Sequence, residues 1–501
     1  MPVSTHSFSQ TTLSTPLARP ASETFLCASV YGIGRIAPSK ALTIAVIGTG
    51  YVGLVSGVCL AAIGHHVIGV DTNLDKIKSL QAGETPLYEQ GLPELQQEAQ
   101  RQGNLVFTHA LEEALTQAKV CMLAVGTPQR DDGSADLTAL HEVVETIIRY
   151  YHTLKERFKP QVLVVKSTVP VGTCTVLQTK LTEAGVALQV ISNPEFLKQG
   201  VAVHDFMVPE RVLVGSLWGE HTQTLQAHRY LDTLMRTMYQ PWIEHQDAPI
   251  PYVHVSRHSA EMAKYACNAF LATKISFMNE MASLCELMGA DVQDVKHIMG
   301  LDERIGAKFL QAGIGYGGSC FPKDVKALHA MAHSHAYEAK ILRSVDETNK
   351  QQPLRFLHRV KQSMPTQNFQ GCRVAIWGLA FKPDTDDMRE APSIPMIRTL
   401  LNEGAEVHVY DPEAMPNAQK IFQTLLPSSQ IVHYHPHALS ALQEADVLLV
   451  LTEWHIFKTI PASQIRHAMH GNLIADGRHL FDVEAFTSLG MTLLQIGRPS
   501  P

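Results

Sequence analysis

A cysteine stands in the octapeptide GGSCFPKD at residues 317–324, after two glycines and a serine and before a lysine and an aspartate. A thiol in such a stretch can pack in a core, form a disulfide, bind a metal or act as a nucleophile. The 501-residue chain has eight cysteines, scattered and never in C-x-x-C spacing. That is too dilute for a secreted disulfide scaffold and favours a reducing cytoplasm, so the role of Cys320 depends on the rest of the chain.

Gly48, Gly50 and Gly53 form the pattern G-x-G-x-x-G, which binds a dinucleotide when a strand precedes it and a helix follows. The first glycine permits a tight turn, the second lets backbone N–H groups approach a pyrophosphate, and the third lets helix and strand pack closely. Asp71 follows after about 20 residues, where a carboxylate can bond the ribose hydroxyls. Because that acid would repel the extra phosphate of NADP, the pattern predicts a site for NAD.

Four further residues are ambiguous when each is taken alone. Thr127 lies in a loop after an apolar strand, where it is expected to face a ligand. Glu195 follows Asn-Pro at the expected start of a helix, so a first-turn acid that favours the helix dipole is as good an interpretation as a functional role. Lys264 and Asn268 are four residues apart and share one helix face, but a solvated lysine with an incidental asparagine is the simpler interpretation.

The elements that must hold these residues begin at Leu42. Residues 42–71 show a β-branched strand, a glycine turn, a helix with small residues and a second strand, which is a βαβ unit. Residues 119–128 and 160–173 are apolar strands that open into Gly/Thr/Pro loops, and residues 186–200 give another strand. In an open parallel sheet such loops lie at the ligand-facing carboxyl edge.

A second Rossmann-like region begins at Cys372 and repeats the plan of strand, glycine turn, helix, strand and aspartate. It lacks G-x-G-x-x-G, so we expect it to hold a different ligand. Lys382 and Arg478, at strand ends, are candidate contacts to phosphate or carboxylate. The histidines of HYHPH (433–437) have no Cys or acid at ligand spacing beside them, so a solvated loop is favoured and no metal site is predicted.

Between these regions, residues 259–300 form a long helical run with an apolar stripe. The stripe indicates core or a subunit interface, and we expect at least a homodimer; it comprises Met278, Met281, Leu284, Cys285 and Met288. The expected fold class is therefore α/β, with two Rossmann-like doubly wound domains joined by a long central helix. The predicted divisions are a disordered tail at 1–40, an NAD-binding domain at 41–250, a central helical region at 251–360 and a C-terminal domain at 361–501.

Composition limits the partners. A formal net charge of −7 without basic runs gives no footprint for nucleic acid or an anionic membrane surface. The longest apolar stretches, such as 445–451, are strand-sized and far below a membrane span. Residues 1–40 are rich in Ser, Thr and Pro and lack apolar periodicity, which predicts the tail.

In this order, seven segments resemble the UDP-glucose/GDP-mannose dehydrogenase superfamily across about 42–490: GTGYVGL, VGTP, KSTVPVGT, NPEFLKQG, KYACNAFLATKISFMNE, GLDERIGAKFLQAGIGYGGSCFPKD and GLAFKPDTDDMREAPS. The resemblance implies oxidation of UDP-glucose to UDP-glucuronate with two NAD⁺. A primary alcohol must lose four electrons to become a carboxylate, so the aldehyde has to be captured between two hydride transfers. Cys320 would add to it, giving a thiohemiacetal, then a thioester, which water hydrolyses.

The same resemblance implies residue roles. The catalytic set would be Cys320, Lys264, Asn268, Asp324, Glu195 and Thr127, with Lys264 and Asn268 stabilising oxyanions and Asp324 with Thr127 orienting a water. The NAD set would be Gly48, Gly50, Tyr51, Val52, Gly53, Asp71, Lys76, Thr127, Lys323 and Arg389. The substrate set would be Glu195, Phe196, Leu197, Lys264, Asn268, Arg304, Phe309, Gly317, Lys382 and Arg478, with Arg304 reaching the neighbouring subunit's substrate. Gly317 and Gly318 would leave room beside the sugar, and Lys323 would favour the thiolate.

One departure and three alternatives remain. Gln199 stands where many relatives carry Glu, so an amide replaces any role of that carboxylate. GDP-mannose oxidation shares much of the pattern. A single-hydride hydroxyacid dehydrogenase would share the first domain but would not need the thiol. A non-catalytic nucleotide-sugar sensor would keep the glycines without reason to keep Cys320, Lys264, Asn268 and Asp324 together.

Overall fold

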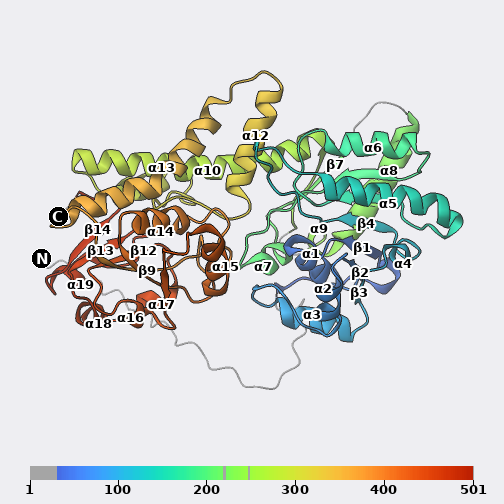
Figure 1. The fold of residues 1–501 in the computed structure, drawn as a ribbon. Helices are drawn as coiled ribbons and strands as arrows, with labels where there is room; N and C mark the ends of the chain where they lie inside the picture. The colour runs from blue at the N-terminus through green and yellow to red at the C-terminus, as the bar shows by residue number, and fades with distance from the viewer. Residues whose placement is uncertain (1–30, 218–221, 246–248, 500–501) are drawn as a thin grey trace, which may run out of the picture.

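The computed structural model describes residues 31–217, 222–245 and 249–499. Two separate sheets are connected by one long helix, α10 (Arg257–Met288), which passes over both (Figure 1). This confirms the predicted class of two Rossmann-like α/β domains joined by a central helix. No helix within these ranges is long and apolar enough to cross a membrane.

In the described residues the N-terminal sheet has eight strands in the order β3-β2-β1-β4-β5-β6-β7-β8, parallel except between β6 and β7. Alternate residues of β1 enter apolar cores on opposite faces, Ile44 and Val46 on one and Ala45 and Ile47 on the other. Burial on both faces explains the continuous apolar runs of these strands. They are β1 (Thr43–Ile47), β2 (His66–Val70), β3 (Leu105–Thr108), β4 (Val120–Leu123), β5 (Val162–Val165), β6 (Gln189–Ser192), β7 (Val212–Ser216) and β8 (Tyr252–Ser256).

Helices cover this sheet on both sides (Figure 1). They are α1 (Tyr51–Ala62), α2 (Leu74–Gln81), α3 (Leu92–Arg101), α4 (Leu111–Leu115), α5 (Thr138–Leu154), α6 (Thr173–Glu183), α7 (Ala202–Met207), α8 (Thr222–Met238) and α9 (Gln240–Ile243), with 3-10 turns η2 (Pro38–Lys40) and η3 (Lys155–Arg157). The parallel strands place the loops after β1, β4, β5 and β6 at one edge of the sheet. The predicted ligand loops therefore share that edge.

The central region is not one continuous helix over 259–300. Gly289 ends α10 in a left-handed conformation with φ of 76°, and α11 (Val292–Gly300) follows after a turn. The helices α12 (Phe321–Ser334) and α13 (Lys340–Ser363) pack on α10 (Figure 1). The predicted apolar stripe is divided: Met278 and Cys285 are buried, whereas Leu284 and Met288 are exposed. One side of α10 thus joins the core and another stays uncovered.

The C-terminal sheet has six parallel strands within the described residues, in the order β11-β10-β9-β12-β13-β14. They are β9 (Arg373–Trp377), β10 (Glu406–Tyr410), β11 (Val432–Tyr434), β12 (Val447–Val450), β13 (Leu473–Asp476) and β14 (Thr492–Gln495). The helices are α14 (Ser393–Asn402), α15 (Met415–Leu425), α16 (Ala438–Ala441), α17 (His455–Lys458), α18 (Ala462–Ala468) and α19 (Val483–Thr487). Two cores again lie on opposite faces of the sheet.

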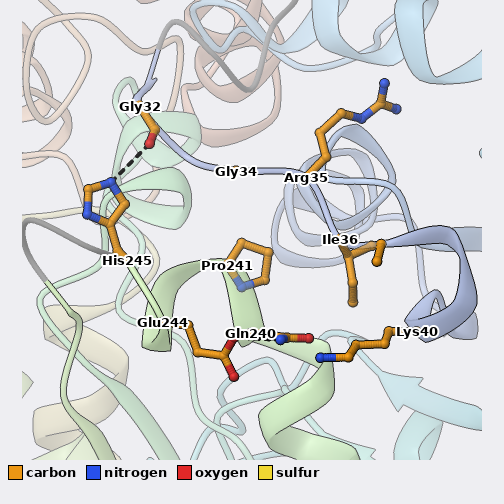
Figure 2. Close-up of a pocket in the computed structure, with 10 residues that line it drawn as sticks. Gly32, Gly34, Arg35, Ile36, Lys40, Gln240, Pro241, Glu244 and His245 are labelled. Atoms are coloured by element: carbon orange, nitrogen blue, oxygen red, sulfur yellow. Dashed lines mark hydrogen bonds between the residues drawn. The ribbon is translucent and has the colours of Figure 1, made fainter.

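The prediction of a disordered tail over 1–40 is wrong for its last ten residues; residues 1–30 lie outside the described ranges. Ile33 and Ile36 are buried, and the Ile36 N–H donates to the Ile63 carbonyl over 2.8 Å. This segment borders a hollow beside α9, where a ring nitrogen of His245 is 3.0 Å from the Gly32 carbonyl oxygen (Figure 2). The burial of Ile33 and Ile36 attaches this segment to the N-terminal domain. The Ser/Thr/Pro-rich composition of residues 1–40 gave no indication of these two apolar contacts.

Candidate active site

The first glycine turn has the geometry that each glycine was predicted to need. Gly48 has φ of 94°, and a Cβ there would lie 2.8 Å from the Ala124 carbonyl oxygen. A Cβ on Gly53 would lie 1.8 Å from the Gly48 carbonyl oxygen, so only glycine lets α1 approach β1 this closely. A Cβ on Gly50, the N-cap of α1, would meet open space. The turn therefore leaves its open side at a helix N-terminus, where a pyrophosphate fits.

Asp71 lies beside this turn, just after β2. Its carboxylate accepts hydrogen bonds from the Thr49 backbone and hydroxyl, from the Asn73 N–H, and from Lys76 over 2.8 Å. Burial disfavours its charge, but these donors outweigh burial and lower its pKa to about 2. Asp71 is therefore an ionised acceptor at neutral pH. Lys76, predicted as a cofactor contact, is held by this carboxylate.

The catalytic candidates gather where α10 and α12 pack against each other (Figure 1). Cys320 is the N-cap of α12. On α10, Lys264 donates to Glu195 with an N–O distance of 3.1 Å, and Asn268 donates to Asp324 over 2.6 Å. These four partners are all nearly inaccessible to solvent. The i, i+4 pair that was ambiguous in sequence therefore faces two buried carboxylates instead of solvent.

The charged groups of this cluster shift one another's pKa values. Burial raises the pKa of the Cys320 thiol and Glu195 raises it further, while Lys264 opposes both. Burial also disfavours the charge of Lys264, but Glu195, Cys320 and Asp324 outweigh it and raise the lysine's pKa. The Lys323 ammonium pairs with Asp324 at 2.5 Å, and its predicted effect on the thiolate stays a prediction. Lys264 therefore favours the thiolate. Arg389 also interacts with Cys320: Asp387 raises the pKa of the arginine, and the charge of Cys320 raises it further.

Glu195 lies in the loop between β6 and α7, not in the first turn of a helix, because α7 begins only at Ala202. Its Oε2 accepts from the Leu197 N–H over 2.5 Å, which leaves Oε1 for Lys264. The neighbouring Phe196 ring lies under Lys264 at 5.2 Å and under the Arg211 guanidinium at 4.0 Å. The helix-dipole interpretation is therefore wrong, and the acid is part of the buried cluster.

On the side where a Cβ would stand, Gly317 and Gly318 face protein, and their predicted contact with a sugar stays a prediction. A Cβ on Gly317 would lie 2.4 Å from the Glu390 carbonyl oxygen, and one on Gly318 would lie 2.7 Å from the Phe381 ring. The Gly318 N–H donates to the Arg389 carbonyl over 2.7 Å. The two glycines let the C-terminal domain close onto the loop that carries Cys320.

The remaining substrate candidates are spread over the loops of both domains. Lys382 donates to the Gln199 carbonyl oxygen, which ties the C-terminal domain to the loop after Glu195. Arg478 donates to the Leu451 carbonyl over 2.8 Å and lies 3.3 Å from Glu453. Two others lie as follows: Arg304 pairs with Asp302 on the surface, and Phe309 packs against Phe321. The guanidinium of Arg389, a cofactor candidate, pairs with Asp387.

Thr127 is the catalytic candidate that the described contacts do not link to the cluster. Its hydroxyl is buried and donates to the Thr168 carbonyl over 2.7 Å. Within the described part of the chain, the acceptor of this hydroxyl is that backbone oxygen and not Asp324. A shared water between Thr127 and Asp324 stays a prediction.

Two buried residues were missed. Glu89 accepts from the Tyr51 hydroxyl and from the backbone N–H groups of Gly200 and Ala202 at 2.8 and 2.7 Å, which connects α1 to the loop after Glu195. Lys166, after β5, donates to Asn193 over 3.2 Å and to the Tyr239 hydroxyl over 3.3 Å. Neither has a sequence signal, because their partners lie far away along the chain.

Comparison with known proteins divides the chain into three consecutive segments that correspond to the two Rossmann-like domains and the central helices between them. Three profiles of the UDP-glucose/GDP-mannose dehydrogenase family match: the NAD binding domain over residues 42–243, the central domain over 258–351 and the UDP binding domain over 375–483. Cys320 and the α10 cluster lie in the segment matched by the central domain.

Individual relatives agree with the profiles. The chain is 40% identical over 467 residues to a UDP-glucose 6-dehydrogenase of Pseudomonas aeruginosa, covering 91% of this chain and 98% of that one. It is 40% identical over 460 residues to UDP-glucose 6-dehydrogenase TuaD of Bacillus subtilis, covering 91% and 93%. The structure resembles a UDP-glucose dehydrogenase from Pyrobaculum islandicum with a TM-score of 0.78 and 34% identity, covering 89% and 96%.

Proposed function

Because the chain belongs to the UDP-glucose/GDP-mannose dehydrogenase family, we propose that it oxidises the C6 alcohol of UDP-glucose to the carboxylate of UDP-glucuronate with NAD⁺. The observation that carries this proposal is the buried cluster at Cys320. A thiol beside a lysine, an amide and two carboxylates supplies every group that a four-electron oxidation through a covalent aldehyde adduct needs. A dehydrogenase that removes a single hydride has no use for the thiol.

Bound NAD⁺ would accept one hydride from the alcohol and, as a second molecule, one hydride from the thiohemiacetal. The chain's residues fit its binding: the open turn at Gly50 suits the pyrophosphate, and the ionised Asp71 suits the ribose hydroxyls. Between the two hydride transfers the aldehyde has to stay in the site. Cys320 would retain it by forming a carbon–sulfur bond, while the thiol proton passes to the former carbonyl oxygen.

Lys264 and Asn268 would stabilise that oxygen whenever it carries negative charge. The lysine donates one of its three N–H groups to Glu195, and the asparagine donates one of its two to Asp324. Each therefore keeps a donor for the substrate, and its orientation is fixed by a buried carboxylate. Water then attacks the thioester carbon, Glu195 takes the proton from that water, and the Cys320 thiolate leaves.

The C-terminal domain would hold the UDP portion. Lys382 and Arg478 lie in loops after β9 and β13, at the carboxyl edge of that sheet. Since Lys382 already contacts the Gln199 carbonyl, substrate bound there would lie next to the Glu195 loop.

We also propose a homodimer through the uncovered side of the central helices. Leu287 and Met288 are 81% and 77% exposed. Other exposed apolar residues nearby on α10, on α11 and just after it are Phe270, Phe277, Leu284, Ile298 and Leu301. The Arg304 side chain, 89% exposed, would then reach the partner's substrate. Light scattering should show at least a dimer at micromolar concentration; an active monomer would contradict both points.

The predicted domain bounds of 41–250, 251–360 and 361–501 and the cytoplasmic location remain part of this proposal. The location is supported by the seven cysteines in the described residues, all of which are free thiols.

The test combines substrate choice with stoichiometry. Purified protein would be given NAD⁺ with UDP-glucose, GDP-mannose or UDP-N-acetylmannosamine, and NADH would be followed by absorbance. We expect UDP-glucose to be turned over fastest, with two NADH formed per UDP-glucuronate and no free aldehyde. Preference for GDP-mannose would contradict the proposed substrate, and one NADH per product would contradict the covalent route.

Cys320→Ala should nearly abolish this reaction, because it removes the atom that retains the aldehyde. Quenched samples would be assayed for NADH, aldehyde and UDP-glucuronate, with Cys372→Ala as the control, since that partly buried thiol lies in the C-terminal domain. The control should match the unmodified enzyme. UDP-glucuronate formed by Cys320→Ala at the unmodified rate would make Cys320 a packing residue.

A further inference from the structure

The edge of the C-terminal sheet brings together three side chains from two strands, Glu406 and His408 of β10 and His433 of β11. Strands β10 and β11 are parallel neighbours, with His408 directly opposite His433, and Glu406 lies two residues before His408 on the same face. The two imidazole rings stack with centroids 4.6 Å apart and planes 13° apart. Histidines were discounted as ligands because no acid lies near HYHPH in sequence; the fold supplies that acid from the neighbouring strand.

The distances between donor atoms suit a single small cation. One carboxylate oxygen of Glu406 and one ring nitrogen from each of His408 and His433 lie within 4.8 Å of one another. Glu406 Oε1 is already 2.8 Å from His408 Nε2. Two ligand atoms on one tetrahedral zinc ion lie about 3.4 Å apart, so the donor spacing is in range. An imidazole binds a metal in the plane of its ring, so the stacked His433 ring has to turn out of its parallel arrangement with His408 when the ion binds.

A fourth residue holds the central ligand in place. His435 Nε2 is 2.8 Å from His408 Nδ1, the ring nitrogen that faces away from Glu406. If His408 donates its Nδ1–H to His435, its Nε2 lone pair is free to bind a metal. Histidine ligands commonly have this arrangement, with the second nitrogen bonded to an acceptor.

We propose that Glu406, His408 and His433 bind a divalent transition-metal ion of the zinc type, with His435 as a positioning residue. Two neutral imidazoles and one carboxylate form a ligand set that zinc accepts, leaving one position for water. The site lies at the amino-terminal half of β10, at the opposite end of that strand from the loops assigned to UDP. Its role is therefore structural: it ties β11, the three-residue edge strand, to the rest of the sheet.

One neighbouring cation opposes binding. The Arg373 guanidinium lies 3.0 Å from Glu406 Oε1 and also donates to the Gln443 carbonyl. A metal would share the carboxylate with this arginine, which lowers the affinity. Arg373→Gln should consequently bind the ion more tightly than the unmodified protein, a result that no generic loss of structure would produce.

The test titrates EDTA-treated, dialysed protein with Co²⁺ followed by visible absorbance, with Zn²⁺ as competitor, and counts bound metal by mass spectrometry. We expect one tight equivalent with the bands of four- or five-coordinate Co²⁺, displaced by Zn²⁺, and a higher melting temperature of the metal-loaded protein. His433→Ala and Glu406→Gln should lose that equivalent, and His435→Ala should weaken it about 10- to 100-fold.

His467→Ala is the matched control, because His467 is an exposed histidine on α18 of the same domain and outside the cluster. The chain has 25 histidines, so dispersed binding is the competing explanation. The same metal stoichiometry in the unmodified protein, His433→Ala and Glu406→Gln would assign the ion to dispersed histidines and overturn the proposal. Circular dichroism would check folding, and Glu406→Gln carries the test if His433→Ala is unstable.

Discussion

Six strands of the first sheet have the same order as the six described strands of the second, but the two domains use the acid after the second strand in different ways. The order β3-β2-β1-β4-β5-β6 of the first sheet corresponds to β11-β10-β9-β12-β13-β14 of the second. Asp71 follows β2 and Asp411 follows β10. The Asp71 side chain is 12% exposed, whereas Asp411 is 1% exposed and accepts from five donors: the N–H groups of Leu379, Ala380, Glu413 and Ala414 and the Trp454 indole.

The glycine turns after the first strand of each domain, at Gly48 and Gly378, also differ: the first leads to a ligand site and the second to a fixed loop. After Gly48 the chain enters α1 within three residues, and the open space at Gly50 faces that helix N-terminus. After Gly378 it continues through a long loop before α14 begins at Ser393. Asp411 holds the start of that loop through the Leu379 and Ala380 N–H groups. The same topology therefore gives an acid that can recognise a ligand in one domain and an acid that fixes a loop in the other.

The largest effect that would sharpen this comparison is expected from Asp411→Ala. It leaves buried N–H donors without an acceptor, which should lower the free energy of unfolding by about 3 kcal/mol or more. Urea unfolding followed by fluorescence would measure the change. Glu413→Gln, two residues later, should have little effect. If Asp411→Ala were as stable as the unmodified protein, the structural role of this acid would be wrong.

Asp71→Ala should have a different profile, with a large change in cofactor choice and a smaller loss of stability than Asp411→Ala, because its hydrogen-bond donors are less buried. The unmodified enzyme should prefer NAD⁺ strongly. The variant should lose about tenfold in kcat/KM for NAD⁺, the value of a hydrogen bond to a charged group, and should discriminate less against NADP⁺ because a repulsive charge is gone. Kinetics with both cofactors would measure it, and equal use of NAD⁺ and NADP⁺ by the unmodified enzyme would contradict the role of Asp71.

These contrasts show what the sequence could and could not predict. Strand, turn and acid follow each other along the chain, so both Rossmann-like regions and the roles of Gly48 and Gly53 could be read directly. Whether Asp411 faces a ligand depends on Trp454 and other residues far along the chain, which no local pattern reveals.

The catalytic cluster shows the same limit. The i, i+4 spacing predicted that Lys264 and Asn268 share a face, but the carboxylates they meet come from the loop after β6 and from α12. The packing of Gly317 against the Glu390 carbonyl is a contact between domains, which no local sequence pattern reveals.

Two further strand ends extend the comparison, at positions that differ by one residue. The strand pairing puts Asp476 and Gln495 in the places of Val165 and Ser192, just before Lys166 and Asn193. In the first sheet Lys166, after β5, donates to Asn193, just after β6. In the second sheet Asp476, at the end of β13, accepts from Gln495 at the end of β14. Asp476 also accepts from the N–H groups of Leu480 and Phe481. Among the described residues the hydrogen-bonded neighbours of Lys166 are Asn193 and Tyr239, both uncharged, so this buried cation has no direct carboxylate partner there.

Lys166→Met should have the smallest effect on stability of the three variants, and it tests whether the buried lysine carries its charge without a carboxylate partner. Burial lowers the pKa of Lys166 to about 8, although Glu195 opposes the shift. An unfolded lysine keeps its proton to about pH 10.4, so between these values the unfolded chain binds more protons than the folded one, and stability of the unmodified protein should rise with pH. Below pH 8 the cost of the buried charge is constant and is partly offset by hydrogen bonds to Asn193 and Tyr239.

The methionine variant has neither the charge nor those hydrogen bonds, so near pH 7 its stability should differ from the unmodified protein by only about 1 kcal/mol. From pH 8 to about 10 the unmodified protein should gain stability relative to it, because only the unmodified protein can release this proton on folding. Urea unfolding at several pH values would measure the difference, in which other titrations common to both proteins cancel. Lys159→Met, at an exposed lysine before β5, should give a profile parallel to that of the unmodified protein. A Lys166→Met profile that is also parallel would mean that Lys166 keeps its proton when buried, and the contrast between the two sheets would then rest on the acids alone.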